Sequence, residues 1–287
     1  MSNNVFGALL MMASMASFTF NDTFIKMTDG AVPLWQLLFL RGVLTTMLIL
    51  GLGNVLRTIH FRMSGRDWRL IGMRCLSEIG AAYFFLSALF QMPLANAIAI
   101  LQVLPLAVSL GAALFLGEGL GWRRMTAILI GFCGMLLIVR PGPDGFSIWS
   151  IYALLAVLCV TCRDLVTRQL SPDVPSLTVT LIAAISVTLF AGIASVPQGW
   201  AVLTPNLWSL IVGSSIFILG GYFFSVQVMR QGDISFIAPF RYTSLIFALA
   251  LGWLIFDDWP DGITLIGAGI IVATGLFTLY RERNAAR

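Results

Sequence analysis

The sequence predicts an all-α polytopic membrane protein, with ten transmembrane helices arranged as two inverted five-helix repeats. Three observations lead to this fold class: the composition, a series of long apolar runs, and a similarity between the two halves. Of the 287 residues, 59% are hydrophobic and only 10% are charged, whereas a soluble domain carries about 25% charged residues. A soluble core of this length has no room for so much apolar surface, so we expect the chain to lie in a bilayer.

Apolar runs of roughly 20 residues follow one another along the whole chain, and each is long enough to cross a hydrocarbon layer of about 30 Å as a helix. Charged residues or Pro and Gly separate the runs. Because the connections are short, we expect the functional site to lie between the helices. The ten expected helices are 5–27, 33–53, 68–90, 94–116, 123–140, 148–168, 175–196, 206–229, 233–256 and 262–280.

The first run is interpreted as a membrane helix and not as a signal peptide. It starts at Val5 without a positively charged segment before it. It is also too long for a signal core and has no cleavage site of the A-x-A type.

The basic residues predict the orientation of the chain. With the N-terminus in the cytoplasm, eleven arginines fall in inner segments, and only Lys26 and Arg140 fall in outer ones. Cytoplasmic loops carry an excess of Lys and Arg, so we expect both termini to be cytoplasmic. The same distribution accounts for the formal charge of +4 without a nucleic-acid partner.

The two halves resemble each other in sequence. NDTFIKMTDGAVP at 21–33 aligns with RDLVTRQLSPDVP at 163–175, and YFF occurs both at 83–85 and at 222–224. The matched pairs are Asp22 with Asp164, Lys26 with Arg168, Pro33 with Pro175 and Glu118 with Asp257. The preserved spacing indicates a duplication.

Each half contains five expected helices, an odd number, so the second half must cross the membrane in the opposite sense. We expect the repeats to be residues 1–142 and 143–287. Inverted repeats are typical of secondary transporters, whose substrate site lies near the midplane between the repeats.

The chain resembles the drug/metabolite transporter superfamily, in particular its EamA branch. The resemblance is clearest in LANAIAILQVLPLAVSLGAALFLGEGLGWRRMTAILIGFCGMLLIVRPG at 94–142, and FIAPFRYTSLIFALALGWLIFDDWPDGITLIGAGIIVATG at 236–275 repeats it more loosely. It covers essentially the whole chain. It implies a transporter whose helices one, three, four, six, eight and nine line a central cavity, with helices five and ten behind them.

Within that branch, the chain is most similar to bacterial proteins associated with riboflavin uptake. The similarity lies in the sequences of helices one and six and in FRYTS at 240–244. Other members of the branch resemble exporters of amino acids and metabolites, or S-adenosylmethionine carriers. The resemblance is specific for fold and transport and weak for the substrate.

Charged residues inside the expected helices point to a polar path, because a charge at the centre of a membrane helix costs about 2.5–3.5 kcal/mol on insertion scales. Arg74 and Glu78 are four residues apart and share a helix face. Arg163 and Asp164 lie in the inner half of their helix, as does Arg241. We expect these five residues to form one inner cluster with a formal charge of +1, which suits a substrate with carboxylate, phosphate or carbonyl acceptors.

Asp22 lies near the outer end of its helix, where Arg41 of the next helix can approach it. Since Asp22 and Asp164 are repeat mates, our hypothesis is that they guard the outer and inner mouths of one path. The alternative is structural: these charges fix helix packing, or Asp22 and Lys26 reach towards lipid headgroups.

Aromatic and amide side chains near the inner cluster are candidates for contact with a flat substrate ring. They are equally ordinary filling between helices. The candidates are Tyr83 and Gln102 in the first half, with Tyr222, Gln227, Phe240 and Tyr242 in the second.

Proline and glycine mark special positions in four helices. Pro105 and Pro239 lie inside helices and permit kinks, which either serve a rocking motion or are static. Close-packing positions are expected at Gly131, Gly134, Gly267, Gly269 and Gly275.

Two motifs favour other classes of protein. Asp257, Asp258 and Asp261 spell D-D-x-x-D, the pattern by which membrane prenyltransferases hold magnesium, but one such motif in a short outer turn more simply ends a helix. Cys159-x-x-Cys162 lacks the further ligands of a zinc site. The only histidine, His60, lies in an inner loop. We therefore expect no metal, no cofactor and no enzyme activity, and we see no filter-like loop of a channel.

Taken together, these observations predict a secondary carrier in the inner membrane of a bacterium that moves a small aromatic or carboxylated metabolite by alternating access. Uptake of a riboflavin-like compound is the specific hypothesis. Export of amino acids or related metabolites is the alternative, and a membrane prenyltransferase is a remote one. A homodimer is compatible with the sequence, which does not determine the direction of transport or the coupling ion.

Overall fold

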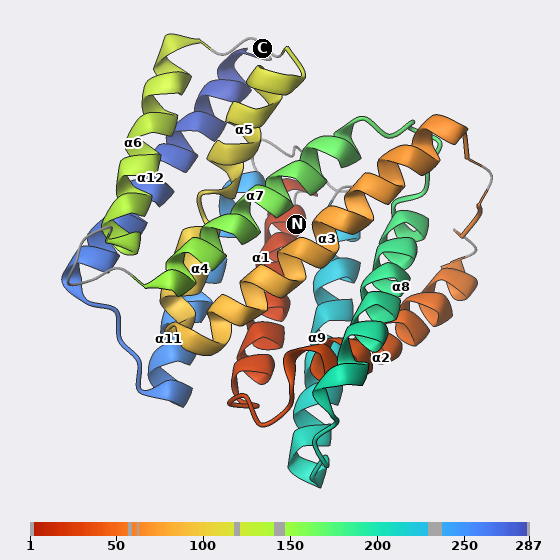
Figure 1. The fold of residues 1–287 in the computed structure, drawn as a ribbon. Coiled ribbons are helices and arrows are strands. Elements are labelled where there is room, and N and C mark those ends of the chain that lie inside the picture. The colour runs from red at the N-terminus through yellow and green to blue at the C-terminus, as the bar shows by residue number, and fades with distance from the viewer. Residues whose placement is uncertain are drawn as a thin grey trace.

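The computed structural model describes residues 3–56, 59–61, 63–117, 121–140, 147–228 and 237–285. Every regular element in this part of the chain is a helix (Figure 1). The first half contains α1 (Asn3–Lys26), α2 (Leu34–Leu56), α3 (Gly65–Gln91), α4 (Leu94–Leu101), α5 (Leu104–Phe115) and α6 (Trp122–Val139). The second half contains α7 (Ile148–Arg168), α8 (Ser176–Ser195), η1 (Val196–Gln198), α9 (Pro205–Val228), η2 (Ala238–Tyr242), α11 (Thr243–Phe256) and α12 (Gly262–Ala285).

These elements agree with the ten expected helices. Among the described residues, eight helical segments are long and apolar enough to cross a membrane, and α4 with α5 forms one of them. Two shorter apolar helices, Met125–Val139 and Gly262–Thr278, bring the number to ten. The predicted boundary between the halves at 142, and Glu118 of the repeat alignment, lie outside the described residues.

The ends of the helices follow local capping. α3 begins at Gly65, three residues before the prediction, because the Ser64 Oγ accepts a hydrogen bond of 3.1 Å from the Asp67 N–H and so satisfies one free donor of the first turn. α12 continues to Ala285 instead of ending at 280. The apolar pattern that set the predicted end stops there, but the helical backbone continues through the charged tail.

The two proline-containing helices are broken at related places. α4 ends at Leu101 and α5 starts at Leu104 with Pro105 in its first turn. In the second half, the η2 turn contains Pro239 and passes directly into α11. A proline removes a backbone hydrogen bond from a helix, which explains why the expected kinks occur as short non-α segments.

The packing of the helices reflects the inverted repeat. α1 packs along α9, and α3 packs along α7. If each helix is replaced by its counterpart in the other half, the α1–α9 pair becomes the α7–α3 pair. The same replacement leaves the pairs α2–α8 and α6–α12 unchanged. In Figure 1, α3 and α7 cross the front of the molecule side by side, and α6 and α12 stand together at its left.

Glycine permits the close approach of α6 and α12. A Cβ on Gly134 would lie 2.9 Å from the Gly267 carbonyl oxygen, so neither position has room for a side chain. The expected close packing is present at this pair, whereas Gly269 has open space around it and is not a packing position among the described residues. The sequence pattern identified the contact because small residues let membrane helices approach each other.

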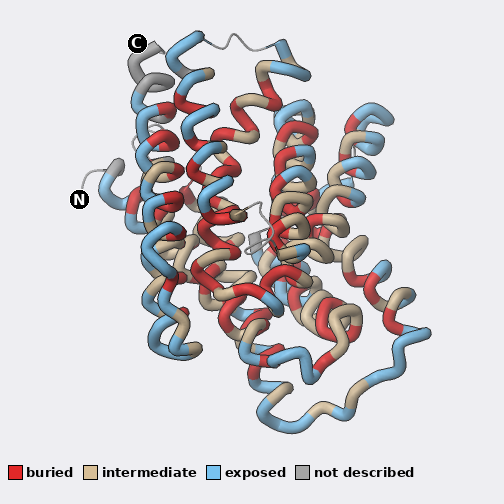
Figure 2. Tube along the Cα trace, turned by 60° about the vertical axis from the view of Figure 1, so that its left-hand side comes forward, coloured by how far each residue is buried: buried red, intermediate tan, exposed pale blue. Residues whose placement is uncertain are grey.

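Buried residues lie on the inward faces of the helices, and exposed residues gather on the outside (Figure 2). Many of the exposed side chains are large and apolar, including Leu76 at 72%, Phe115 at 79% and Ile193 at 75% exposed. In water such a surface would drive aggregation. In a bilayer it is the lipid-facing surface.

Candidate functional site

Glu78 is the centre of a cluster of charged side chains in the middle of the helix bundle. Its Oε1 lies 3.4 Å from the Arg163 Nη1 of α7, and its Oε2 lies 3.8 Å from the Arg74 Nη2, one turn away on α3. Arg163 also contacts its neighbour Asp164, with 2.9 Å from Nη2 to Oδ1. The expected pairing of Arg74 with Glu78 is present, and α7 supplies the other two charges.

Thr167 adds a hydroxyl group to this cluster. The Arg74 Nη1 donates a hydrogen bond of 2.8 Å to the Thr167 Oγ1, and that hydroxyl donates one of 2.6 Å to the Arg163 carbonyl. The sequence reasoning did not select Thr167. Its position four residues after Arg163 places both on one helix face, which was the available signal.

Asp22 and Arg41 are joined by a residue that the sequence reasoning also missed. Asn21 donates a hydrogen bond of 2.9 Å to the Asp22 Oδ1 and accepts one of 3.2 Å from the Arg41 Nη1. The side chain of Asn21 therefore bridges the carboxylate and the guanidinium. Asp22 and Arg41 approach each other as expected, through a neutral intermediate.

Tyr222 of α9 interacts electrostatically with both groups. It lies within electrostatic range of Glu78, Arg163, Arg41 and Arg74, and its ring makes an edge contact with Phe18 at 5.6 Å between centroids. Arg41 is likewise within electrostatic range of Glu78. The hypothesis that Asp22 and Asp164 guard opposite mouths stays a prediction. We call the two groups together the charged network: Asn21, Asp22, Arg41, Arg74, Glu78, Arg163, Asp164, Thr167 and Tyr222.

The charged network is formally neutral and partly accessible. Three arginines balance three carboxylates, so the surplus of +1 expected for the inner cluster is absent. The side chains of Arg163 and Asp164 are 24% and 32% exposed, which is unusual for the interior of a membrane protein unless they face water or a substrate.

Tyr83 belongs to a separate aromatic group. Its ring stacks on Trp35 of α2 at 5.2 Å and 7°, and it meets Tyr152 of α7 at 6.0 Å. The ring of Tyr83 contacts the rings of Trp35, Phe84 and Tyr152, so it stands apart from the charged network.

Gln102 lies at the break between α4 and α5 and is buried. Its Nε2 donates a hydrogen bond of 2.5 Å to the Ser244 Oγ at the start of α11. Ser244 in turn donates one of 3.0 Å to the Arg241 carbonyl in η2. Gln102 therefore connects the helix breaks of the two halves.

Three candidates in the second half are placed differently from the expectation. Arg241 makes no ion pair with the described residues of the charged network. Tyr242 is 5% exposed, and its hydroxyl ends against Gly275 of α12, where a Cβ would collide with it. Gln227 is half-buried near the end of α9 and is not a described member of the charged network. The sequence placed these three residues at the depth of the inner cluster. In the structure, their positions in η2 and α9 keep them out of the charged network.

The aspartates of the D-D-x-x-D motif end one helix and start the next. Asp257 adopts a left-handed conformation with φ 54° at the end of α11. Asp261 accepts a hydrogen bond of 2.9 Å from the Thr264 N–H at the start of α12 and forms an ion pair with Arg140. Within the part of the chain that the structure describes, no group of three His, Cys, Asp or Glu residues is arranged to hold a metal.

Comparison with known proteins agrees with this architecture. The model of the EamA-like transporter family matches residues 5–140 and 147–280. A riboflavin transporter of Vibrio cholerae is 28% identical over 246 residues, which cover 85% of this chain and 80% of that protein. A pseudopaline exporter of Pseudomonas aeruginosa is 26% identical over 284 residues, covering 96% of both chains.

Two further comparisons complete this set. An S-adenosylmethionine uptake transporter of Rickettsia bellii is 29% identical over 198 residues, which cover 67% of this chain and 66% of that protein. One solved crystal structure aligns with a TM-score of 0.67 and 19% identity over 96% of this chain and 98% of the other. At this identity the likeness shows the fold alone.

Proposed function

Because the chain belongs to the EamA-like transporter family, we propose that this multi-pass secondary transporter of small metabolites moves its substrate between two inverted halves by alternating access. Inverted repeats support such a motion, since each half can adopt the conformation of the other. The halves in this proposal are residues 1–142 and 143–287. Because the chain belongs to a family of transporters, the prenyltransferase alternative no longer holds. The aspartates of the D-D-x-x-D motif lie at the ends of helices.

The observation that carries the proposal is the charged network. Its members come from α1, α2, α3, α7 and α9, so both halves contribute. Buried charges without a function are costly to retain, and these are partly exposed between helices. A path that brings a polar molecule past them requires both halves to move.

The substrate that fits this site best is a small polar molecule with a flat ring, and uptake of a riboflavin-like compound is our specific proposal. Arginine forks bind carbonyl and carboxylate oxygens in pairs, and the aromatic residue Tyr222 interacts electrostatically with Arg163 and Arg41. The formal neutrality of the charged network suits a neutral ring system better than an anion. The likeness to the Vibrio cholerae riboflavin transporter supports this choice.

Export of amino acids or related metabolites is the second candidate. Equal numbers of arginines and carboxylates suit a zwitterion, whose two charges pair with both signs at once. The pseudopaline exporter, which matches over 96% of both chains, is the comparison that favours export.

We place the protein in the inner membrane of a bacterium with both termini in the cytoplasm. The excess of arginine in the segments on the terminal side supports this orientation. A homodimer is compatible with the apolar outer surface.

Uptake of radiolabelled riboflavin in a bacterium that lacks riboflavin synthesis and import tests the proposal. We expect the wild-type protein to support uptake, Arg163→Gln to abolish it at equal abundance, and Arg241→Gln to retain most of it, since Arg241 is outside the charged network. Absence of uptake by well-expressed wild-type protein contradicts the riboflavin proposal. Efflux of amino acids from preloaded cells then tests the second candidate.

A protonophore added to the same assay separates proton-driven transport from facilitated diffusion. Loss of accumulation with unchanged initial exchange indicates proton coupling. Unchanged net uptake indicates a facilitator.

A further inference from the structure

Lys26 ends α1 and ties it to the end of α3. Its Nζ donates hydrogen bonds of 3.1 Å to the Leu89 carbonyl and 2.5 Å to the Met92 carbonyl. The last carbonyls of a helix have no partner within the helix, and a cation is favourable at that end. The ammonium group therefore closes the gap between the ends of two helices of the first half.

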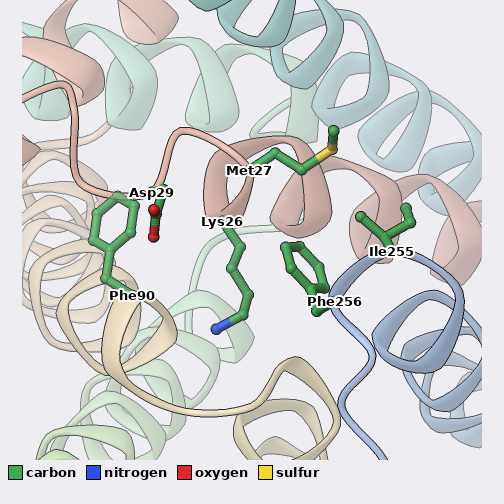
Figure 3. A pocket seen from close by; sticks show the side chains of 6 residues that line it. All are labelled: Lys26, Met27, Asp29, Phe90, Ile255 and Phe256. Carbon is green, nitrogen blue, oxygen red and sulfur yellow. The ribbon is translucent and has the colours of Figure 1, made fainter.

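The same side chain reaches the second half. Its Nζ lies 5.4 Å from the ring centroid of Phe256, the last residue of α11, in the geometry of a cation–π interaction. Figure 3 shows the Lys26 chain extending between Phe90 and Phe256. Around it is a cavity of about 240 Å³ lined by Lys26, Met27, Asp29, Phe90, Ile255 and Phe256.

This end of the bundle is closed by apolar side chains. Ile25, Leu89 and Leu94 are fully buried there at 0% exposed, and Leu86 is 2% exposed. They belong to one apolar cluster that also includes residues of α2, α8, α9 and α11. Within the described part of the chain, these side chains pack the region where the ends of α1, α3 and α11 meet.

Lys26 also has a second set of partners nearby. Asp29 lines the same cavity, and both Asp29 and Asp258 lie within electrostatic range of the ammonium group. A lysine has three N–H donors, and two of them are used by the α3 carbonyls. The ammonium group can therefore leave these carbonyls for a carboxylate and still have an oxygen acceptor for its N–H donors.

We propose that Lys26 is the positioning residue of the gate at this end: bound to the α3 carbonyls it holds the gate closed, and its transfer to Asp29 or Asp258 lets the gate open. Outward opening separates α11 from α1 and α3, which breaks the contact with Phe256. The repeat mate of Lys26 is Arg168, at the end of α7, so the inverted half carries a cation at the corresponding place of the opposite end. The identification of this gate as the outer one rests on the proposed function and its orientation.

Cysteine labelling with a membrane-impermeant maleimide tests the gate without any substrate. The full-length chain, with Cys75, Cys133, Cys159 and Cys162 replaced by serine, receives one probe at a time in spheroplasts and in inverted vesicles. Leu86→Cys is the probe behind the closed gate, and Gln227→Cys is the probe near the opposite end. Each probe is combined with Lys26→Met, Lys26→Arg or the wild-type lysine.

We expect Lys26→Met to raise the labelling rate of Leu86→Cys from outside at least about tenfold, the effect of losing one hydrogen bond to a charged group, and to lower that of Gln227→Cys from inside. Lys26→Arg should restore both rates, because it retains the charge and the donors. Arg69→Met is the matched control: it removes one exposed arginine at the other end of α3 and should change neither rate.

Faster labelling of both probes would mean that the methionine only loosens helix packing. That result would overturn the proposed gate. Unchanged labelling of both probes overturns it as well. If Leu86→Cys reacts faster only from the cytoplasmic side, the gate stands but the proposed orientation fails. Because no substrate is used, failure of riboflavin uptake does not affect these outcomes.

Discussion

Gln102 and Ser244 join the helix breaks of the two halves by one buried hydrogen bond, 2.5 Å from Nε2 to Oγ. The breaks occur at corresponding places, and each is associated with a proline. A hydrogen bond between side chains next to these two breaks links the movements of the breaks. We therefore expect this pair to couple the two halves during transport.

Replacing Gln102 with leucine or Ser244 with alanine should reduce the transport rate of reconstituted protein. Ser244→Ala leaves the buried Gln102 amide without its partner, which costs about 1–3 kcal/mol, whereas after Gln102→Leu the Ser244 hydroxyl keeps its bond to the Arg241 carbonyl. In a double-mutant cycle on transport rate and thermal stability, we expect a coupling of about 0.5–1.5 kcal/mol between the two positions. Additive effects would show that the two breaks move independently.

Arg163→Gln should strongly reduce both transport and stability. The change leaves Glu78 with Arg74 alone at 3.8 Å. Loss of one partner of a buried pair costs about 3–5 kcal/mol, and the partial exposure of Arg163 reduces the expected loss to about 1–3 kcal/mol.

Adding Glu78→Gln should recover stability without recovering transport, because the uncompensated charge is removed but the guanidinium is still missing. Thermal unfolding in detergent and uptake at matched abundance measure the two effects. Arg69→Gln is the control for the loss of one exposed arginine. Recovery of transport in the double variant would assign Arg163 to packing alone.

Two tyrosine variants should separate the charged network from helix packing. Tyr222→Phe removes a hydroxyl within range of four charged residues, and we expect transport to fall several-fold. Tyr242→Phe removes a buried hydroxyl that has no hydrogen-bond partner among the described residues. Since an unsatisfied buried hydroxyl costs about 1–3 kcal/mol, this variant should transport normally and unfold at an equal or higher temperature. The reverse pattern would place Tyr242 in the substrate path.

Asp67→Ala should destabilise the junction between α3 and the connection that follows α7. The Asp67 carboxylate is buried and accepts hydrogen bonds of 3.1 Å from the Ser171 N–H and 3.0 Å from the Ser171 Oγ. We expect a loss of about 1–3 kcal/mol, the usual result of leaving such groups unpaired. Thermal unfolding measures it, with Asp173→Ala, an exposed residue of the same connection, as the control. Equal effects of both variants would exclude a specific role of the Asp67 bonds.

Asp261→Asn should lower thermal stability by the same amount at every pH from 5 to 8. The Thr264 N–H and hydroxyl, followed by Arg140, hold the pKa of the Asp261 carboxyl at about 2 instead of 3.8. A lowered pKa contributes stability that is complete above the unfolded value and disappears as the pH falls through about 2. The difference from the wild type therefore stays constant in the neutral range and shrinks only in acid. A difference that changes between pH 6 and 8 would mean that another group interacts with this turn.

The existence of the helices, and the close contact of one helix pair, were predictable from the sequence. Long apolar runs place α1, α2 and the other helices because the bilayer requires about 20 apolar residues per crossing. Pro105 and Pro239 predicted the breaks, and Gly134 with Gly267 predicted a close contact of α6 with α12. The charged residues inside the helices also identified most members of the charged network, because a charge there needs a partner.

The connections between those residues were decided only by the tertiary structure. The sequence by itself determined a ten-helix transporter with inverted halves, since length, hydropathy and repeat spacing are properties of the chain. It did not determine that Asn21 bridges Asp22 to Arg41, that the Tyr242 hydroxyl ends against Gly275, or that Lys26 binds the end of α3. Depth in the membrane follows from position along a helix, whereas the partner of a side chain depends on helix rotation and tilt, which are set by packing between segments far apart in sequence.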